Sequence, residues 1–244
     1  MPEPATVPPG VATVASDRGP AVRLVLVRHG EAVCNVGGVV GGRRGCTGLT
    51  ERGVAQAEAL RDRLRRTGEL GPVDLLVASS LARARETARI VAPGLGAADR
   101  PALEVAYDPG LDELRPGLAD GLTWAEFAER YPEPDWDADP GTPLAPEAES
   151  WTGFVARAGE ALVRLATAPA ADARGSSART VVAVCHAGVI EASLLHRLPV
   201  GGRHRLGLRT RHASLTEWSI EDGAWRLERY NDATPVGPEP TPFG

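Results

Sequence analysis

The sequence contains no lysine, so all 27 of its Lys and Arg positions are arginine. This excludes enzymes that depend on the lysine of a phosphate-binding loop, on a Schiff base, or on the strand lysine of protein kinases. Cysteine is scarce too, since Cys34, Cys46 and Cys185 are an odd number without a Cys-x-x-Cys pair. Such usage is typical of a reducing compartment and not of a disulfide framework, and we expect a cytoplasmic protein.

Long apolar runs and an excess of positive charge are also missing. No stretch approaches the roughly 20 apolar residues of a membrane helix, so we expect no membrane partner. The net charge of −5 argues against a nucleic-acid partner, because such proteins present a basic face. Residues 1–20 lack a basic segment followed by an apolar one, which predicts a disordered leader and not a signal peptide; residues 233–244 predict a proline-rich tail.

Between these ends, residues 21–232 have the pattern of a single α/β domain. Three continuous apolar runs predict strands that are covered on both faces of a parallel sheet, and a helical pattern follows each one. This alternation predicts a three-layer α/β/α sandwich around a mostly parallel sheet. The predicted strands cover residues 22–27, 73–79 and 180–185, and the predicted helices cover residues 51–66, with Thr50 as N-cap, 81–91 and 188–198.

The middle of the chain, from about residue 108 to 150, has a different composition. It is rich in proline, carries or adjoins Trp124, Trp136 and Trp151, and has one helical pattern near residues 123–131. We expect an insertion that lies over the carboxyl-terminal edge of the strands. Farther on, residues 213–220 and 224–230 predict a β-hairpin at a sheet edge, where pairing with a second copy makes a homodimer a candidate assembly.

Basic side chains follow all three predicted strands. Arg28 and His29 end the first strand, Arg83 lies shortly after the second, and His186 follows the third. Because the carboxyl ends of parallel strands meet at one edge, where open α/β sheets bind ligands, these four groups are expected to converge. Two guanidiniums and two imidazoles repel one another unless an anion lies between them, and a phosphoryl group fits the fork of arginine donors. The expected partner is a small phosphorylated metabolite.

Four segments of the chain form a set: they read LVRHGEAVCN, SSLARARETA, LDELRPGLADG and VCHAGVIEA. The first contains an Arg-His-Gly tripeptide at the end of strand one, the second an arginine before a helix, the third several acids and the fourth a second histidine. These segments resemble the motifs of the histidine phosphatase superfamily, the phosphoglycerate-mutase-like fold, in which the third motif holds the proton donor. They occur in the order of the family, and the resemblance spans roughly residues 22–231.

The resemblance implies a role for each of these residues. His29 is the nucleophile that becomes a phosphohistidine, and Arg28, Arg83 and His186 bind the phosphoryl oxygens and stabilise the charge that develops during transfer. Glu113 protonates the leaving oxygen and later deprotonates the attacking water.

Two assignments in this set stay less direct. Asp112 or Asp120 is an alternative to Glu113 as the proton donor, because both acids lie in the same segment. Asn35, at the position of the family's asparagine, is expected to donate a hydrogen bond to phosphate from the loop after strand one.

The sequence also departs from the family pattern. Ala32, Cys34 and His212 stand where many members have threonine, tryptophan and asparagine. The resemblance therefore does not determine the shape of the pocket wall or the identity of the substrate. Arg43 and Arg44 predict either a rim for a substrate phosphate or a solvated loop. A second basic run predicts a solvated loop or a contact with an anionic substrate; it consists of Arg203, Arg205, Arg209 and Arg211.

The function expected from these patterns is a metal-independent phosphatase that hydrolyses a small phosphate monoester through phospho-His29, with no cofactor. His196, His204 and His212 lack metal-ligand spacing, so no metal is predicted. A phosphoglycerate-type mutase with the same intermediate is the nearest alternative, although the Glu-Arg-His-Tyr-Gly run typical of mutases is absent. A non-catalytic protein that binds a phosphorylated ligand is the alternative of another class.

Overall fold

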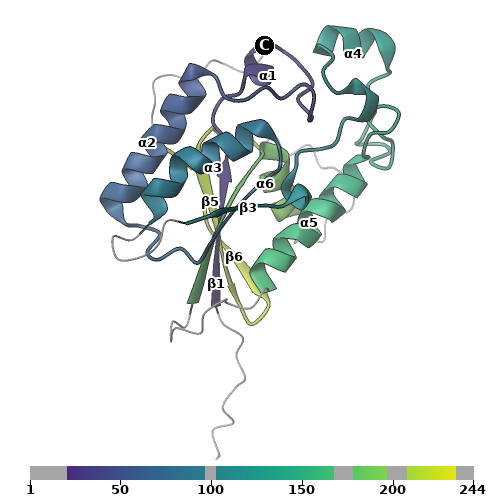
Figure 1. Ribbon diagram of the computed structural model, residues 1–244. Helices are drawn as coiled ribbons and strands as arrows, with labels where there is room; N and C mark the ends of the chain where they lie inside the picture. The colour runs from purple at the N-terminus through teal and green to yellow at the C-terminus, as the bar shows by residue number, and fades with distance from the viewer. Residues whose placement is uncertain (1–20, 97–102, 168–177, 197–207, 235–244) are drawn as a thin grey trace, which may run out of the picture.

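The computed structural model describes residues 21–96, 103–167, 178–196 and 208–234 of the chain (Figure 1). These residues form a six-stranded sheet in the order β3-β2-β4-β1-β5-β6. The first four of these strands run parallel, β5 is antiparallel to β1, and β6 is antiparallel to β5. The strands are β1 (Ala21–Arg28), β2 (Leu75–Ala78), β3 (Val105–Tyr107), β4 (Ala178–Cys185), β5 (Ser214–Glu221) and β6 (Ala224–Ala233).

Within the described residues, six α-helices and two short 3-10 helices connect the strands. Thr50 caps α2 as predicted, since its hydroxyl accepts a hydrogen bond from the Gly53 amide at 3.0 Å. The edge strand β3 and the one-turn helix α1 were not predicted, because three or four residues are too few to show a period. The helices are α1 (Val33–Val36), α2 (Glu51–Thr67), α3 (Ala82–Leu95), η1 (Pro109–Leu111), η2 (Gly117–Ala119), α4 (Trp124–Arg130), α5 (Trp151–Thr167) and α6 (Ala187–Leu195).

The predicted three-layer sandwich is confirmed by the two sides of β1. Leu24 and Leu26 are fully buried on the face covered by α5 and α6, in a cluster that includes Phe154. Val25 and Val27 are fully buried on the opposite face, against α2 and α3. Burial on both sides explains why the strand is apolar at consecutive positions, and each such side chain contributes about 1.5–3 kcal/mol to the hydrophobic stabilisation.

The insertion lies where the sequence predicted it, over the carboxyl-terminal edge of the strands. Figure 1 shows α4 at the same end of the molecule as α1, which follows β1. The loop after α1 joins the two segments: the Val40 amide donates to the Leu122 carbonyl at 2.8 Å, and the Trp124 amide to that of Gly38 at 2.9 Å. A separate small core around Val40 and Phe127 supports the insertion.

The ends of the chain add little to this picture. The leader, residues 1–20, and residues 235–244 of the tail lie outside the described residues, whereas β6 continues to Ala233. Within the described part of the chain, no helix is both long and apolar enough to cross a membrane.

Candidate active site

His29 lies directly after β1, at the carboxyl-terminal edge of the sheet, and is only 3% exposed. Its Nδ1 is 2.6 Å from the carbonyl oxygen of Gly30, an acceptor, so we assign the ring proton to Nδ1. Nε2 then keeps its lone pair. The short turn that holds this geometry needs glycine at position 30, because a β-carbon there would lie 2.3 Å from the Gly53 carbonyl oxygen.

Arg83 joins the two histidines that the sequence placed at separate strands. Its Nε is 3.1 Å from Nε2 of His29 and 3.2 Å from Nδ1 of His186. Its Nη1 donates to the Gly41 carbonyl at 2.7 Å, which fixes the guanidinium from the loop after β1. The side chain is 4% exposed, so the second residue of α3 provides a buried cation and not the surface charge that its helix position alone suggests.

A chain of hydrogen bonds orients His186. Its Nδ1 accepts from Arg83, so its Nε2–H donates to the Ser79 hydroxyl at 2.7 Å, and Ser79 donates in turn to Asp112 at 2.8 Å. Asp112 is 2% exposed and also accepts hydrogen bonds from the amide and hydroxyl of Ser80. Asp112 therefore holds the tip of β2 against His186.

Arg28 and His212 complete the ring of basic groups. Arg28 donates from Nη1 to the Thr210 carbonyl. The Ala213 amide donates to the Arg28 carbonyl at 3.0 Å, and Ala213 has a φ of +51°, so the chain turns sharply before β5. This turn places the ring of His212 5.7 Å from that of His29, while the ring of His186 lies 5.1 Å from it on another side.

All three histidines of the site are held neutral. Burial is the largest cause that lowers the pKa of His29 well below 6.5, followed by the charge of Arg83. Burial and then Arg83 lower the pKa of His186 in the same way. The pKa of His212 falls to about 3, mainly through burial and then through the charge of Arg28. A neutral imidazole with a free lone pair is the form that a nucleophile requires.

Glu113 is half-buried and lines the same cavity as His29. Its carboxylate accepts hydrogen bonds from the backbone amides of Gly188 and Leu114, each at 3.1 Å. The two alternative acids are engaged elsewhere: Asp112 holds Ser79 and Ser80, and Asp120 accepts from three backbone amides of the loop between β1 and α2.

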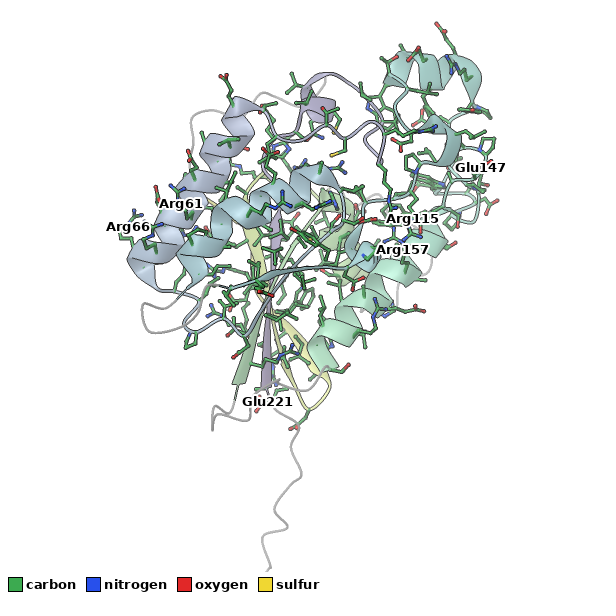
Figure 2. The ribbon with its side chains drawn as sticks, in the orientation of Figure 1. Arg61, Arg66, Arg115, Glu147, Arg157 and Glu221 are labelled. Atoms are coloured by element: carbon green, nitrogen blue, oxygen red, sulfur yellow. The ribbon has the colours of Figure 1, made fainter. Side chains whose placement is uncertain are left out.

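Arg157 on α5 holds the segment that carries Glu113. It forms a paired contact with Glu149, at 2.6 and 2.7 Å, and donates to the backbone carbonyls of Gly110, Asp112 and Glu113. Figure 2 shows Arg157 close to Arg115, which also contacts Glu149, at the junction of α5 and the insertion.

The remaining predicted residues divide into two groups. Asn35 borders the cavity over the site, and its Oδ1 accepts a hydrogen bond from the Ala32 amide at 3.1 Å, which leaves the amide nitrogen to face a ligand. Arg43 lies 3.7 Å from Asp112 with 70% of its side chain exposed, and Arg44 lies 3.9 Å from Asp120. Arg43 and Arg44 are not among the residues that line the cavity.

Comparison with known proteins places this arrangement in a family. The sequence profile of the histidine phosphatase superfamily (branch 1) matches residues 24–233. The chain belongs to that superfamily. It is 34% identical over 206 residues to the adenosylcobalamin/alpha-ribazole phosphatase of Salmonella typhimurium, which covers 84% of this chain and 88% of that protein.

A second relative is similar in sequence and in structure. The chain is 33% identical over 237 residues to the glucosyl-3-phosphoglycerate phosphatase of Mycobacterium tuberculosis, with 88% of this chain and 97% of that protein covered. The structure of a mycobacterial glucosyl-3-phosphoglycerate phosphatase in complex with VO3 matches with a TM-score of 0.66 and 30% identity, over 86% of this chain and 99% of that chain. These two relatives of this histidine phosphatase superfamily member are phosphatases in name, and the substrates in their names differ.

The cavity above the site has a volume of about 1210 Å³. Its lining combines Arg28, His29, Arg83 and Glu113 with apolar side chains, mostly from the insertion. Arg209 and Arg211 line it as well, whereas Arg203 and Arg205 lie outside the described residues. The apolar lining includes Val36, Val39, Leu114, Trp124, Phe127, Trp136, Leu144 and Trp151.

Sequence reasoning missed the roles of several groups at this site. In the sequence, His212 is a departure from the family pattern without metal-ligand spacing, and Ser79 is the end of a predicted strand; neither pattern indicates a role at the site. Their positions relative to His29 and His186 depend on strand pairing, β5 beside β1 and β2 beside β4, which a single sequence does not reveal. In the described part of the chain no group of three or more His, Cys, Asp and Glu residues is arranged to hold a metal ion; the predicted independence from metal stays a prediction.

Proposed function

We propose that this protein hydrolyses a phosphate monoester through a phosphohistidine on His29, without a metal. The observation that carries the proposal is the state of the His29 ring. Nδ1–H is held by the Gly30 carbonyl, and the lone pair on Nε2 faces the buried cation of Arg83 at 3.1 Å. A neutral nucleophile beside a fixed cation is suited to attack on an anionic phosphoryl group.

The first half-reaction transfers the phosphoryl group to the enzyme. The substrate phosphate enters between His29 and the basic groups, and the Arg83 donor turns from Nε2 to the phosphoryl oxygens. Nε2 then attacks phosphorus in line with the ester oxygen, the N–P bond forms and the P–O bond breaks. Arg28, Arg83 and His186 stabilise the charge on the oxygens, and Glu113 gives its proton to the leaving oxygen.

The second half-reaction releases phosphate. Glu113, now a carboxylate, takes a proton from water while the water oxygen attacks phosphorus and the N–P bond breaks. Glu113 is favoured over Asp112 and Asp120 for both steps because, of these three acids, it is the one that lines the cavity.

The decisive test is to trap the intermediate. Wild-type protein, mixed with substrate and quenched in cold alkaline denaturant, should carry phosphate on His29; trypsin cuts after Arg28 and Arg43, so His29 is the single histidine of its peptide. His29→Ala should lose the phosphopeptide and about 1000-fold or more of the turnover. His196→Ala, at the exposed end of α6, is the matched control. Full turnover in His29→Ala would exclude the proposal.

The same assay separates the two alternatives. A mutase forms the same phosphohistidine but returns the phosphoryl group to a bound product, so isomerisation of a phosphoglycerate primed with its bisphosphate would exceed phosphate release. A binding protein would show neither phosphohistidine nor phosphate release across a broad panel of esters, yet would bind a phosphorylated ligand.

The wall of the cavity supports an ester with an apolar or aromatic part. Trp124 is 51% exposed and lines the cavity with Phe127, an amount of open aromatic surface that a contact with substrate would bury. We expect a higher kcat/KM for 1-naphthyl phosphate than for glycerol phosphate. Trp124→Ala should reduce kcat/KM for 1-naphthyl phosphate about 5- to 10-fold and leave kcat/KM for glycerol phosphate unchanged.

Leu118→Ala is the control for that comparison. Leu118 is 44% exposed on η2 but does not line the cavity, so removal of its side chain should change kcat/KM for neither substrate. Equal losses for both substrates in Trp124→Ala would show that the wall does not select the leaving group.

A further inference from the structure

Two buried thiols that the proposed reaction does not use lie beside the site. Cys34 belongs to α1 and is 4% exposed; Cys46 lies in the loop before α2 and is 6% exposed. Each thiol shifts the pKa of the other, so the two side chains are neighbours, and both are free thiols. The sequence places them 12 positions apart, outside any Cys-x-x-Cys pattern.

Both thiols contact Arg83. The Arg83 amide donates to Sγ of Cys46 at 3.4 Å, and Nη1 of Arg83 lies 4.0 Å from Sγ of Cys34. Leu81, the N-cap of α3, offers no side-chain hydrogen bond, so the Cys46 sulfur occupies the place of a cap at the positive end of that 14-residue helix. The thiol pair therefore lies against the residue that holds His29 and His186.

This environment distinguishes the two sulfurs. The hydrogen bond from the Cys34 thiol is the largest cause that lowers the pKa of Cys46, to about 5, and the charge and amide of Arg83 act in the same direction. The pKa of Cys34 is raised, because its thiol serves as the donor and is buried. A thiolate next to a thiol is the arrangement found in pairs that oxidise reversibly.

We propose that Cys34 and Cys46 are a redox modification site that a peroxide converts into a disulfide, which lowers the activity of the neighbouring site. The Cys46 thiolate attacks the O–O bond, becomes a sulfenic acid and releases hydroxide or alkoxide. The Cys34 thiol then attacks that sulfur, the S–S bond forms, the S–O bond breaks and water leaves. The peroxide gains the two electrons that the pair loses, and a dithiol reverses the change.

The local structure provides access and freedom to move. Cys34 lines the cavity, so a peroxide that enters the cavity meets one member of the pair, and Cys46 itself keeps 6% of its surface exposed. Residues 35–45, between the two cysteines, include five glycines, which lowers the cost of drawing the sulfurs together. Cys185, at the end of β4, is fully buried with a raised pKa caused by burial, and is not part of the pair.

The disulfide reaches the active site through Arg83. When the S–S bond forms, the Cys46 sulfur moves away from the Arg83 amide. Cys34 moves against Gly41, where even a β-carbon would lie 2.6 Å from its sulfur, and the Gly41 carbonyl holds Nη1 of Arg83. The effect of the disulfide on activity rests on the proposed function. We expect a fall in kcat of about 10-fold or more, because small displacements of positioning groups have effects of that size.

The test measures the bond and the activity separately. Reduced, full-length protein is treated with hydrogen peroxide, alkylated and digested with trypsin without reductant. Cleavage after Arg43 and Arg44 places the two cysteines in different peptides, residues 29–43 and 45–52, so the disulfide appears as a cross-linked pair. Hydrolysis of p-nitrophenyl phosphate is followed in the same samples, before and after dithiothreitol.

The outcomes are distinct. Cross-linking with a reversible loss of activity, absent in Cys34→Ala and in Cys46→Ser but retained in Cys185→Ala, supports the proposal; each variant is compared with its own reduced form. Absence of the cross-link in the wild type overturns it, and a cross-link without loss of activity overturns the regulatory part. If the reduced protein hydrolyses no ester at all, the proposed function fails while the cross-link still decides the modification site.

Discussion

At the scale of single residues, Gly188 packs directly against the carboxylate of Glu113. A β-carbon at this position, in the first turn of α6, would lie 2.2 Å from Oε1 of Glu113 and 3.0 Å from the ring of Phe154. The Gly188 amide also donates to the other carboxylate oxygen at 3.1 Å. The absence of a side chain therefore decides where the proton donor stands.

Gly188→Ala should displace Glu113 and reduce turnover. We expect kcat for an alkyl phosphate to fall about 10- to 100-fold, because protonation of the leaving oxygen by a placed acid contributes an effect of that order. The helix itself is not weakened, since alanine is the better helix former. With p-nitrophenyl phosphate, whose leaving group needs no acid, phospho-His29 should form and accumulate. Rapid-quench measurement of the phosphoenzyme checks this.

Gly96→Ala is the control for this substitution. Nothing lies within 4 Å of a β-carbon built on Gly96, and its φ of −74° suits any residue. Kinetics that equal the wild type are expected there. The same kinetics in Gly188→Ala would mean that Glu113 is not held by this contact.

The sequence identified the charged groups of the site more readily than their supports. Arg28, His29, Arg83, Glu113 and His186 follow strand ends or motifs. The structure places the first four along one cavity and holds the buried His186 behind them, 3.2 Å from Nε of Arg83. The residues that orient these charged groups are small or neutral, and their role depends on a partner that is distant in the sequence. Ser79, which links His186 to the buried Asp112, is an example. A residue of that kind has no signature of its own in one sequence.

At the scale of elements, α5 and the insertion depend on one arginine. Arg157 contacts Glu149 at the end of the insertion and donates hydrogen bonds to backbone carbonyls of residues 110–113, so it holds these two segments together. The guanidinium donates to two carboxylate oxygens and four backbone carbonyls, a set that requires several donors in a fixed plane. Arg157 does not line the cavity and acts as a positioning residue.

Arg157→Lys should therefore affect both stability and turnover. A single ammonium cannot replace these contacts, and we expect a loss of about 1–3 kcal/mol in the free energy of unfolding. The acid segment should loosen, so kcat for alkyl phosphates should fall by about 10-fold with less change for p-nitrophenyl phosphate. Denaturant unfolding and steady-state kinetics check the two effects.

Arg164→Lys serves as the control on the same helix. The Arg164 side chain is 58% exposed and its contact with Asp108 is long, at 3.3 Å. Exposed pairs of this kind contribute little to stability, so both measurements should match the wild type. Equal effects of the two substitutions would assign the loss to α5 in general and not to the support of the insertion.

At the scale of the whole molecule, buried neutral histidines link folding to pH. The pKa of His212 is lowered from 6.5 to about 3 by burial first and then by Arg28, and those of His29 and His186 are lowered for the same reasons. Below pH 6.5 the unfolded chain binds protons that the folded chain does not. The stabilisation is therefore complete above about pH 6.5 and is lost progressively as the pH falls toward 3.

We expect the free energy of unfolding to decrease between pH 6.5 and 4, by up to about 1.4 kcal/mol per pH unit for each histidine that stays neutral in the fold. Urea titrations across this range measure the slope. His212→Asn should lower the slope of the free energy of unfolding against pH by the contribution of one proton. His196→Ala, at an exposed position, should leave that slope unchanged. A slope that His212→Asn does not alter would show that His212 is protonated in the folded protein.

The sequence alone predicts the layered α/β architecture, because strands buried on both faces must be apolar throughout and each is followed by a helical segment. It also determined the charged groups, because strand ends at one edge of a parallel sheet have to meet. The tertiary structure decided the rest: the pairing of β5 with β1 that brings His212 to His29, the tautomers set by Gly30 and Ser79, and the contact of Cys34 with Cys46. The physical reason is that each of these depends on distances between segments remote in sequence, which only packing fixes.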